Sequence, residues 1–68
     1  MAQITVKIVH EFLDSYNLRP EMRKVFLAKL LGMATSENEV LTPQQLNIIF
    51  EGSESIRSAF EAKLKNNS

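Results

Sequence analysis

Leu41-Thr42-Pro43-Gln44-Gln45-Leu46 decides the fold, because this stretch contains nearly every signal for the start of a helix. Thr42 is a favourable N-cap, whose hydroxyl accepts a backbone N–H one turn further on. Pro43 falls at the first helical position, where a missing N–H has no cost. Gln45 stands where a capping box requires Glu or Gln, and the leucines at the two ends of the stretch can form a hydrophobic staple. The stretch therefore predicts a helical segment and favours a helical reading of its neighbours.

Two helices are expected from this point to the C-terminus. The first should run from Pro43 to about Glu51 and end at Gly52, because glycine readily adopts the backbone conformation that stops a helix. The second should span about Glu54 to Lys65, with residues 66–68 as a frayed tail. Apolar residues recur at helical spacing in both. The expected buried residues are Leu46, Ile49, Phe50, Ile56, Ala59, Phe60 and Leu64.

The N-terminal segment from Ile4 to Tyr16 carries two competing signals. Its apolar residues recur every three or four positions, which predicts one helical face. The first five residues, Ile4 to Ile8, alternate and are rich in β-branched side chains, which also suits a strand. We expect a helix throughout, because the pattern after Val9 is only helical. Asn17 can end it in a left-handed conformation.

A third apolar segment begins at Pro20, which again suits the first position of a helix. Its apolar side chains cover well over half of the helix circumference, so we expect a central helix buried on more than one side. The polar remainder should be a solvent strip. That strip contains Arg23, Lys24 and Lys29. Residues 35–40 are polar and acidic and are expected to form a loop, in which Ser36 and Glu39 can make a second capping box.

The fold class predicted from these segments is all-α, a compact bundle of about four short helices in one domain spanning residues 1–68. The chain has 68 residues, is 44% apolar, contains no cysteine and carries eight basic and eight acidic side chains. A domain of this size buries only about 60% of the surface that its unfolded chain exposes. No secretion signal is apparent, and no apolar run is long enough for a membrane span. We therefore expect a cytoplasmic protein, without a membrane partner, of the size typical of a small bacterial or phage regulator.

The sequence offers little that indicates catalysis. His10 is the only histidine, and Asp14 lies one helical turn further on. A general base needs a nucleophile and a site that excludes water, and a helical domain this small rarely forms such a pocket alone. We interpret the pair as a surface histidine beside a carboxylate. We predict no enzyme, no catalytic residue, no cofactor, no metal and no small-molecule substrate.

One alternative concerns nucleic acid. The segment from Leu41 to Leu46, followed by Phe50 and then by the run Ser53 to Phe60, resembles the helix-turn-helix of bacterial regulators. In that motif a capped helix and a tight turn precede a helix that lies in the major groove. The resemblance implies a DNA-binding regulator whose reading helix spans about Ser53 to Lys65. The residues that it would direct at DNA are Ser53, Ser55, Arg57 and Ser58.

The sequence departs from the helix-turn-helix pattern at the turn. A small residue is expected near Asn47, and a glycine is expected at Glu51, whereas Gly52 comes one residue later. A domain that binds nucleic acid by charge is usually basic overall, and this chain is neutral. We therefore rank DNA binding second.

The function that we expect is that of a non-enzymatic regulatory or adaptor protein acting through protein–protein contacts. The two N-terminal apolar segments carry more apolar surface than the two short stripes after Pro43 are able to cover, and exposed apolar patches mark interaction sites. A homodimer covers such a patch by using it twice. The stripe that we expect to bind the partner is Ile4, Ile8, Phe12 and Tyr16. An intramolecular core is the equal alternative for this stripe.

Overall fold

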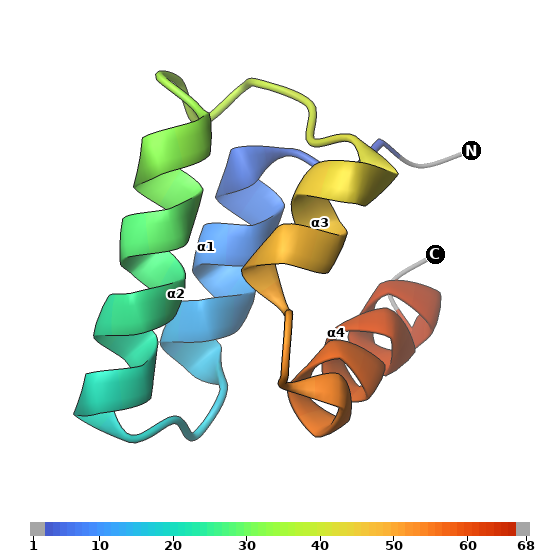
Figure 1. The fold of residues 1–68 in the computed structure, drawn as a ribbon. Helices are drawn as coiled ribbons and strands as arrows, with labels where there is room; N and C mark the ends of the chain where they lie inside the picture. The colour runs from blue at the N-terminus through green and yellow to red at the C-terminus, as the bar shows by residue number, and fades with distance from the viewer. Residues whose placement is uncertain (1–2, 67–68) are drawn as a thin grey trace.

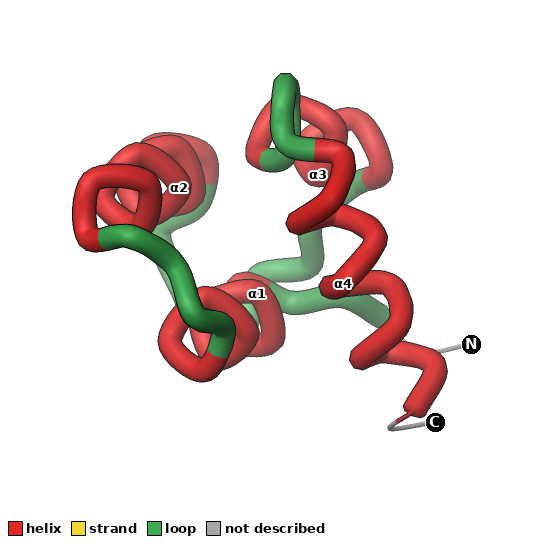
Figure 2. The backbone as a smooth tube through the Cα atoms, turned by 90° about the horizontal axis from the view of Figure 1, so that it is seen from below, coloured by secondary structure: helices red, strands yellow, loops and turns green. Residues whose placement is uncertain are grey.

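The computed structural model describes residues 3–66, and over this range the chain is an all-α bundle, as predicted. Its four helices are α1 (Val6–Ser15), α2 (Pro20–Met33), α3 (Pro43–Ile49) and α4 (Glu54–Asn66). Figures 1 and 2 show α1 beside α2 in the opposite direction, with α3 also next to α2 and with α4 farthest from α2. The predicted tail begins later than expected, because Asn66 still belongs to α4. Asn67 and Ser68 lie outside the described residues.

The start of α3 confirms the prediction made from its sequence. The Gln45 N–H donates to the Thr42 hydroxyl over 3.2 Å, and the Thr42 N–H donates to the Gln45 side-chain oxygen over 2.8 Å. Both halves of the capping box are therefore present. The helix ends at Ile49, slightly earlier than expected. Gly52 follows in the turn with a φ of +76°, a conformation that favours glycine.

The start of α1 corrects the prediction, because Ile4 is not helical, Thr5 is extended and the helix begins at Val6. Thr5 acts as N-cap and also forms an isolated antiparallel bridge with Val40. The Ile4 carbonyl accepts the Leu41 N–H over 2.8 Å. The strand-like alternation at the start of the segment therefore corresponds to one bridge between two loops, and the rest of the segment is helical.

The loop before α3 holds the first turn of α1. The Val6 N–H donates to the Glu39 carbonyl and the Lys7 N–H to the Glu37 carbonyl, each over 3.0 Å. The expected capping box at Ser36 is absent, because the Ser36 hydroxyl accepts the Asn38 N–H and the Glu39 carboxylate accepts from Thr35. This loop satisfies N–H groups that a helix start would otherwise leave unpaired.

All four phenylalanines of the chain meet in the core. The Phe12 ring of α1 lies 5.1 Å from that of Phe60 and 6.5 Å from that of Phe50, and Phe26 of α2 lies 5.8 Å from Phe50. Each helix or helix end therefore contributes one ring to a single aromatic cluster. Edge-to-face and tilted contacts of this kind add to the stabilisation that burial alone gives.

The expectation that the helix starting at Pro20 is central holds only in part, because α2 packs against both α1 and α3 but α1 is the more deeply buried helix. Four residues of α1 are buried, compared with two of α2, namely Phe26 and Leu30. Figure 2 shows α2 at one edge of the bundle, with one side turned away from the other helices. The apolar residues of α2 do surround the helix, but α1 and α3 cover only part of its circumference.

Candidate interaction surfaces

The side of α2 that faces away from the bundle carries large apolar side chains. Leu31 is 69% exposed and Val25 is 53% exposed, while the adjacent Leu30 is fully buried. Ala28 and Gly32 are exposed between them. We call this surface the outer α2 face and define it by Glu21, Lys24, Val25, Ala28, Leu31 and Gly32. Single exposed apolar residues are common, but several on one helix face mark a candidate interaction surface.

The outer α2 face continues toward α3. Met22 and Ile48 are also exposed, and the Lys29 ammonium donates to the Ile48 carbonyl over 3.4 Å, which joins the two helices at this edge. A hollow of about 200 Å³ lies along the same edge, between α2 and the turn that contains Glu51 and Ser53. The apolar surface is therefore wider than one helix.

The predicted partner-binding stripe on α1 lies against the core of the monomer. Phe12 is 3% exposed, and Ile4, Ile8 and Tyr16 are half-buried and packed against the core cluster. The Tyr16 ring stacks on that of Phe12 at 5.1 Å. In this conformation the Phe12 side chain is not available to a partner. The two most exposed large apolar side chains, Val25 and Leu31, lie on α2 instead.

The helix proposed to read DNA is present as α4, and a four-residue turn, 50–53, connects it to α3. Ser55 and Ser58 are exposed, whereas Ser53 and Arg57 are half-buried. The Arg57 guanidinium donates to the Asn47 side-chain oxygen and pairs with Glu61 at 3.5 Å. A base contact by Arg57 would therefore require these two interactions to be given up.

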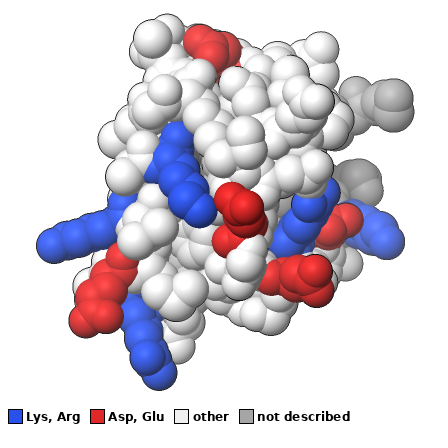
Figure 3. Space-filling model, viewed as in Figure 1, with Lys and Arg blue, Asp and Glu red and all other residues white. Residues whose placement is uncertain are grey.

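The charged side chains are mixed in sign. On the face that Figure 3 shows, Lys and Arg side chains alternate with Asp and Glu side chains. Proteins that bind the phosphate backbone usually gather their basic side chains into a patch or stripe. The charges on this face are mixed and form no such basic patch.

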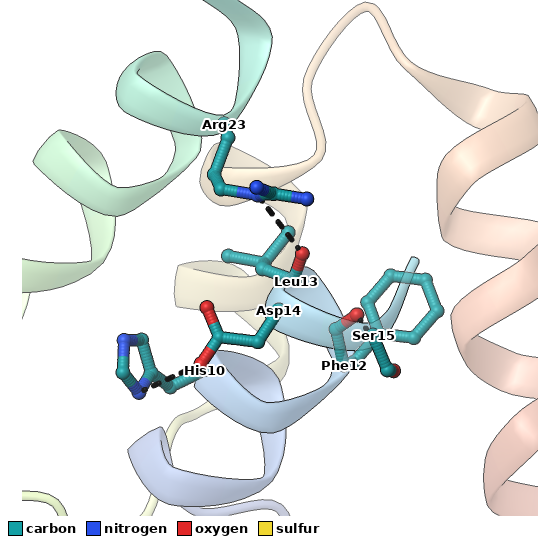
Figure 4. Close-up of polar contacts among 6 residues, drawn as sticks. All are labelled: His10, Phe12, Leu13, Asp14, Ser15 and Arg23. Carbon is teal, nitrogen blue, oxygen red and sulfur yellow. Dashed lines mark hydrogen bonds and ion pairs between the residues drawn. The ribbon is translucent and has the colours of Figure 1, made fainter. Parts of the chain in front are cut away.

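The polar contacts of α1 lie on its exposed side and at its C-terminal end (Figure 4). His10 and Asp14 approach to 3.9 Å, and their side chains are 40% and 59% exposed. Arg23 corrects the expectation that it belongs to a solvent strip, because it is half-buried and its Nε and Nη2 donate to the carbonyls of Leu13 and Tyr16 over 3.3 and 3.2 Å. It therefore satisfies carbonyls at the C-terminal end of α1.

The same end of α1 corrects the expectation for its stop. Tyr16 is the C-cap in an extended conformation, and its N–H donates to the Phe12 carbonyl over 2.8 Å. Asn17 is not left-handed, since among the described residues only Gly52 has a positive φ. Because Arg23 supplies the missing donors from another helix, the chain needs no left-handed residue here.

A second hollow lies between α3 and α4. It has a volume of about 280 Å³, is open to solvent and is lined mainly by apolar side chains, among them Leu46 and Leu64, with Arg57 and Glu61 among its lining residues. Binding sites for small molecules usually span about 300–1,000 Å³ and enclose most of the ligand. This hollow is at the lower limit and is shallow.

Two further findings concern residues 3–66 only. Within this range no three His, Cys, Asp or Glu side chains come together in a way that could hold a metal ion. None of the four helices there combines the length and the apolar character that crossing a membrane requires.

The sequence analysis expected α2 to be more fully buried than it is and so did not identify the outer α2 face. One signal was present. The apolar residues of α2 extend all round the helix, and a helix at the edge of a four-helix bundle cannot bury every side. Which helix lies at the edge depends on the loop that ties α3 to the start of α1, and that loop has no periodic signal.

The chain matches no family model, and comparison with curated proteins and with solved structures gave no match.

Proposed function

We propose that the chain is a non-enzymatic interaction module, a small regulatory or adaptor protein that presents the outer α2 face to a protein partner. The observation that carries the proposal is the exposure of Val25 and Leu31, neither of which belongs to the buried core or packs against it. These two side chains add little to the stability of the monomer, and the exposure of their apolar surface to water is unfavourable. A protein partner that covers them would remove this penalty.

The composition of the face fits a protein partner. Lys24 and Glu21 border the apolar side chains, which gives an apolar centre with a polar rim, the usual arrangement of a protein interface. Ala28 and Gly32 carry little side-chain volume, so a partner helix can approach the backbone closely. The cytoplasm is part of the proposal, since a chain without cysteine needs no oxidising compartment to fold.

Duplex binding through α4 receives less support. Arg57, the strongest candidate for reading a base, is held by Asn47 and Glu61. If the alternative is correct, the chain binds duplex DNA with an affinity that falls steeply with salt, and Arg57→Ala weakens it while the fold persists. A gel shift unchanged by Arg57→Ala counts against α4 as the reading helix.

The proposed function is tested by face-specific loss of binding. The chain is immobilised and exposed to extract of the native host, in parallel with Val25→Asp, with Leu31→Asp and with Ala62→Asp as matched control. Ala62 is an exposed apolar residue on α4, remote in the sequence from the outer α2 face. We expect both α2 variants to lose a protein that the native chain and the Ala62 variant retain.

Circular dichroism at matched concentration shows whether each variant keeps the helical content of the native chain. Equal retention by all four folded proteins would refute the outer α2 face as the binding surface. Loss with Ala62→Asp alone would move the proposed interface to α4.

A further inference from the structure

We infer that the occupant of the outer α2 face is a second copy of this chain, bound through an antiparallel α2–α2 contact whose two-fold axis passes beside Ala28. This inference rests on the proposed function and names its partner. It follows from the spacing of the exposed side chains, from the charges around them and from the position of α2 in the bundle.

The exposed apolar side chains are placed symmetrically about Ala28. Val25 precedes it by three residues and Leu31 follows it by three, so they are displaced about 60° around the helix in opposite directions. Both are more than half exposed. In an antiparallel pair centred on Ala28, Val25 of each copy therefore lies beside the partner's Leu31. The same patch covers itself, which is the requirement of a two-fold interface.

The centre of the face allows the two helices to approach. A Cβ added at Gly32 would meet nothing within 4 Å in the monomer, and Ala28 is exposed. Helices that meet through small residues can pack in the shorter part of the usual interaxial range, at about 9 Å. At that distance Val25 and Leu31 are long enough to reach across to the partner helix on both sides of Ala28.

Charge favours the antiparallel direction over the parallel one. The last turn of α2 carries no basic residue, so the partial negative charge at that end is not offset from within the helix. In the antiparallel pair Lys24 of each copy lies over the partner's last turn, near Gly32. A parallel pair would instead bring the two Lys24 side chains to the same level and align the two helix dipoles, which is unfavourable.

The position of α2 leaves room for this contact. Figures 1 and 2 both show α2 at one edge of the bundle, with α1 and α3 on its inner side. Arg23 and Lys29 are engaged with α1 and α3, so they remain on the inner side and at the edge. A second copy can therefore dock without displacing any contact of the monomer.

Cysteine cross-linking tests the geometry, since the native chain contains no cysteine. Each Cα lies about 2.3 Å from its helix axis, so facing Cα atoms of two helices about 9 Å apart are about 4.4 Å apart, which is within the range for a disulfide at the two-fold axis. Glu21 lies seven residues from Ala28, so its two copies are separated by about 20 Å along the helix axes. Ala28→Cys, Glu21→Cys and the control Glu11→Cys, which is exposed on α1, are oxidised mildly and compared on non-reducing gels.

We expect Ala28→Cys to form a linked dimer at least tenfold faster than the other two variants. We also expect the unmodified chain to sediment at twice its mass of 7.7 kDa at micromolar concentration, with Leu31→Asp remaining a monomer and Ala62→Asp a dimer. Equal cross-linking at Glu21→Cys and Ala28→Cys would overturn the antiparallel contact.

A chain that stays monomeric up to millimolar concentration, with no preferential cross-link, would overturn the second copy as the occupant. The proposed function is separate from that outcome. The proposed function fails only when two results coincide: the chain does not self-associate, and no other protein from the native host is retained through Val25 and Leu31.

Discussion

The two N-terminal helices have similar apolar content but use it differently. In α1 the apolar residues form one stripe, and the core takes up that stripe, with Phe12 and Leu13 buried. In α2 they surround the helix, and only Phe26 and Leu30 are buried, while Val25 and Leu31 face solvent. An amphipathic stripe therefore indicates a helix that completes the core. An apolar circumference on an edge helix indicates a surface that remains to be covered.

The strongest way to break this comparison is to truncate a core side chain of α1. Phe12→Ala removes the ring that contacts Tyr16, Phe50 and Phe60, and we expect it to cost about 3–5 kcal/mol of unfolding free energy. That is a large part of the roughly 3–10 kcal/mol expected for a chain of this length. Urea denaturation followed by circular dichroism measures the loss, and Phe12→Leu keeps the comparison measurable if Phe12→Ala is unfolded. A loss below about 1 kcal/mol would show that α1 is not central.

Two adjacent leucines sharpen the comparison within α2. Leu30 is fully buried and Leu31 is 69% exposed. We expect Leu30→Ala to cost about 2–5 kcal/mol, because it leaves a cavity, and Leu31→Ala to change the unfolding free energy by no more than about 0.5 kcal/mol. Both are measured over a range of protein concentrations, because self-association adds a stabilisation that depends on concentration. Equal losses at low concentration would mean that α2 is buried on both sides.

A third test concerns the contact between the two helices. Arg23→Met keeps most of the side-chain volume but removes the donors to the carbonyls of Leu13 and Tyr16. We expect a loss of about 1–2 kcal/mol, since each carbonyl must then rely on water. Arg19→Met, an exposed change at the start of α2, is the control and should stay within about 0.5 kcal/mol. An equal effect of the two variants in thermal unfolding would show that the cap on α1 contributes nothing.

Much of the fold could be predicted from the sequence, because helix starts are local. The capping box at Thr42, the prolines at the starts of α2 and α3 and the positive φ at Gly52 each depend on a few neighbouring residues. The start of α1 could not be predicted in the same way. Thr5 is extended because the chain pairs there with Val40, and such a pairing between distant loops leaves no periodic pattern.

The sequence indicated that an exposed apolar surface exists, but not where on the molecule it lies. Excess apolar area follows from composition, and the structure does contain exposed apolar residues. Its position depends on which helix is surrounded by the others. Phe12 points into the core and lies near three other rings, whereas Val25 is on the side of α2 that faces away from the other helices. A single sequence indicates which face of each helix is apolar, but not which of these faces pack against one another.

The smallest expected effect is a gain in unfolding free energy from a substitution on the exposed side of α2. Gly32 lies inside the helix, and a Cβ added there would meet nothing within 4 Å. Gly32→Ala should therefore raise the unfolding free energy by about 0.5–1 kcal/mol, because alanine loses less backbone freedom than glycine on folding. Gly52→Ala is the opposite control, since its φ of +76° is unfavourable for alanine by about 1–2 kcal/mol. Both are measured by urea denaturation of dilute protein. Destabilisation by Gly32→Ala would mean that this side of α2 is packed against something even in the monomer, and the contrast with α1 would then be lost.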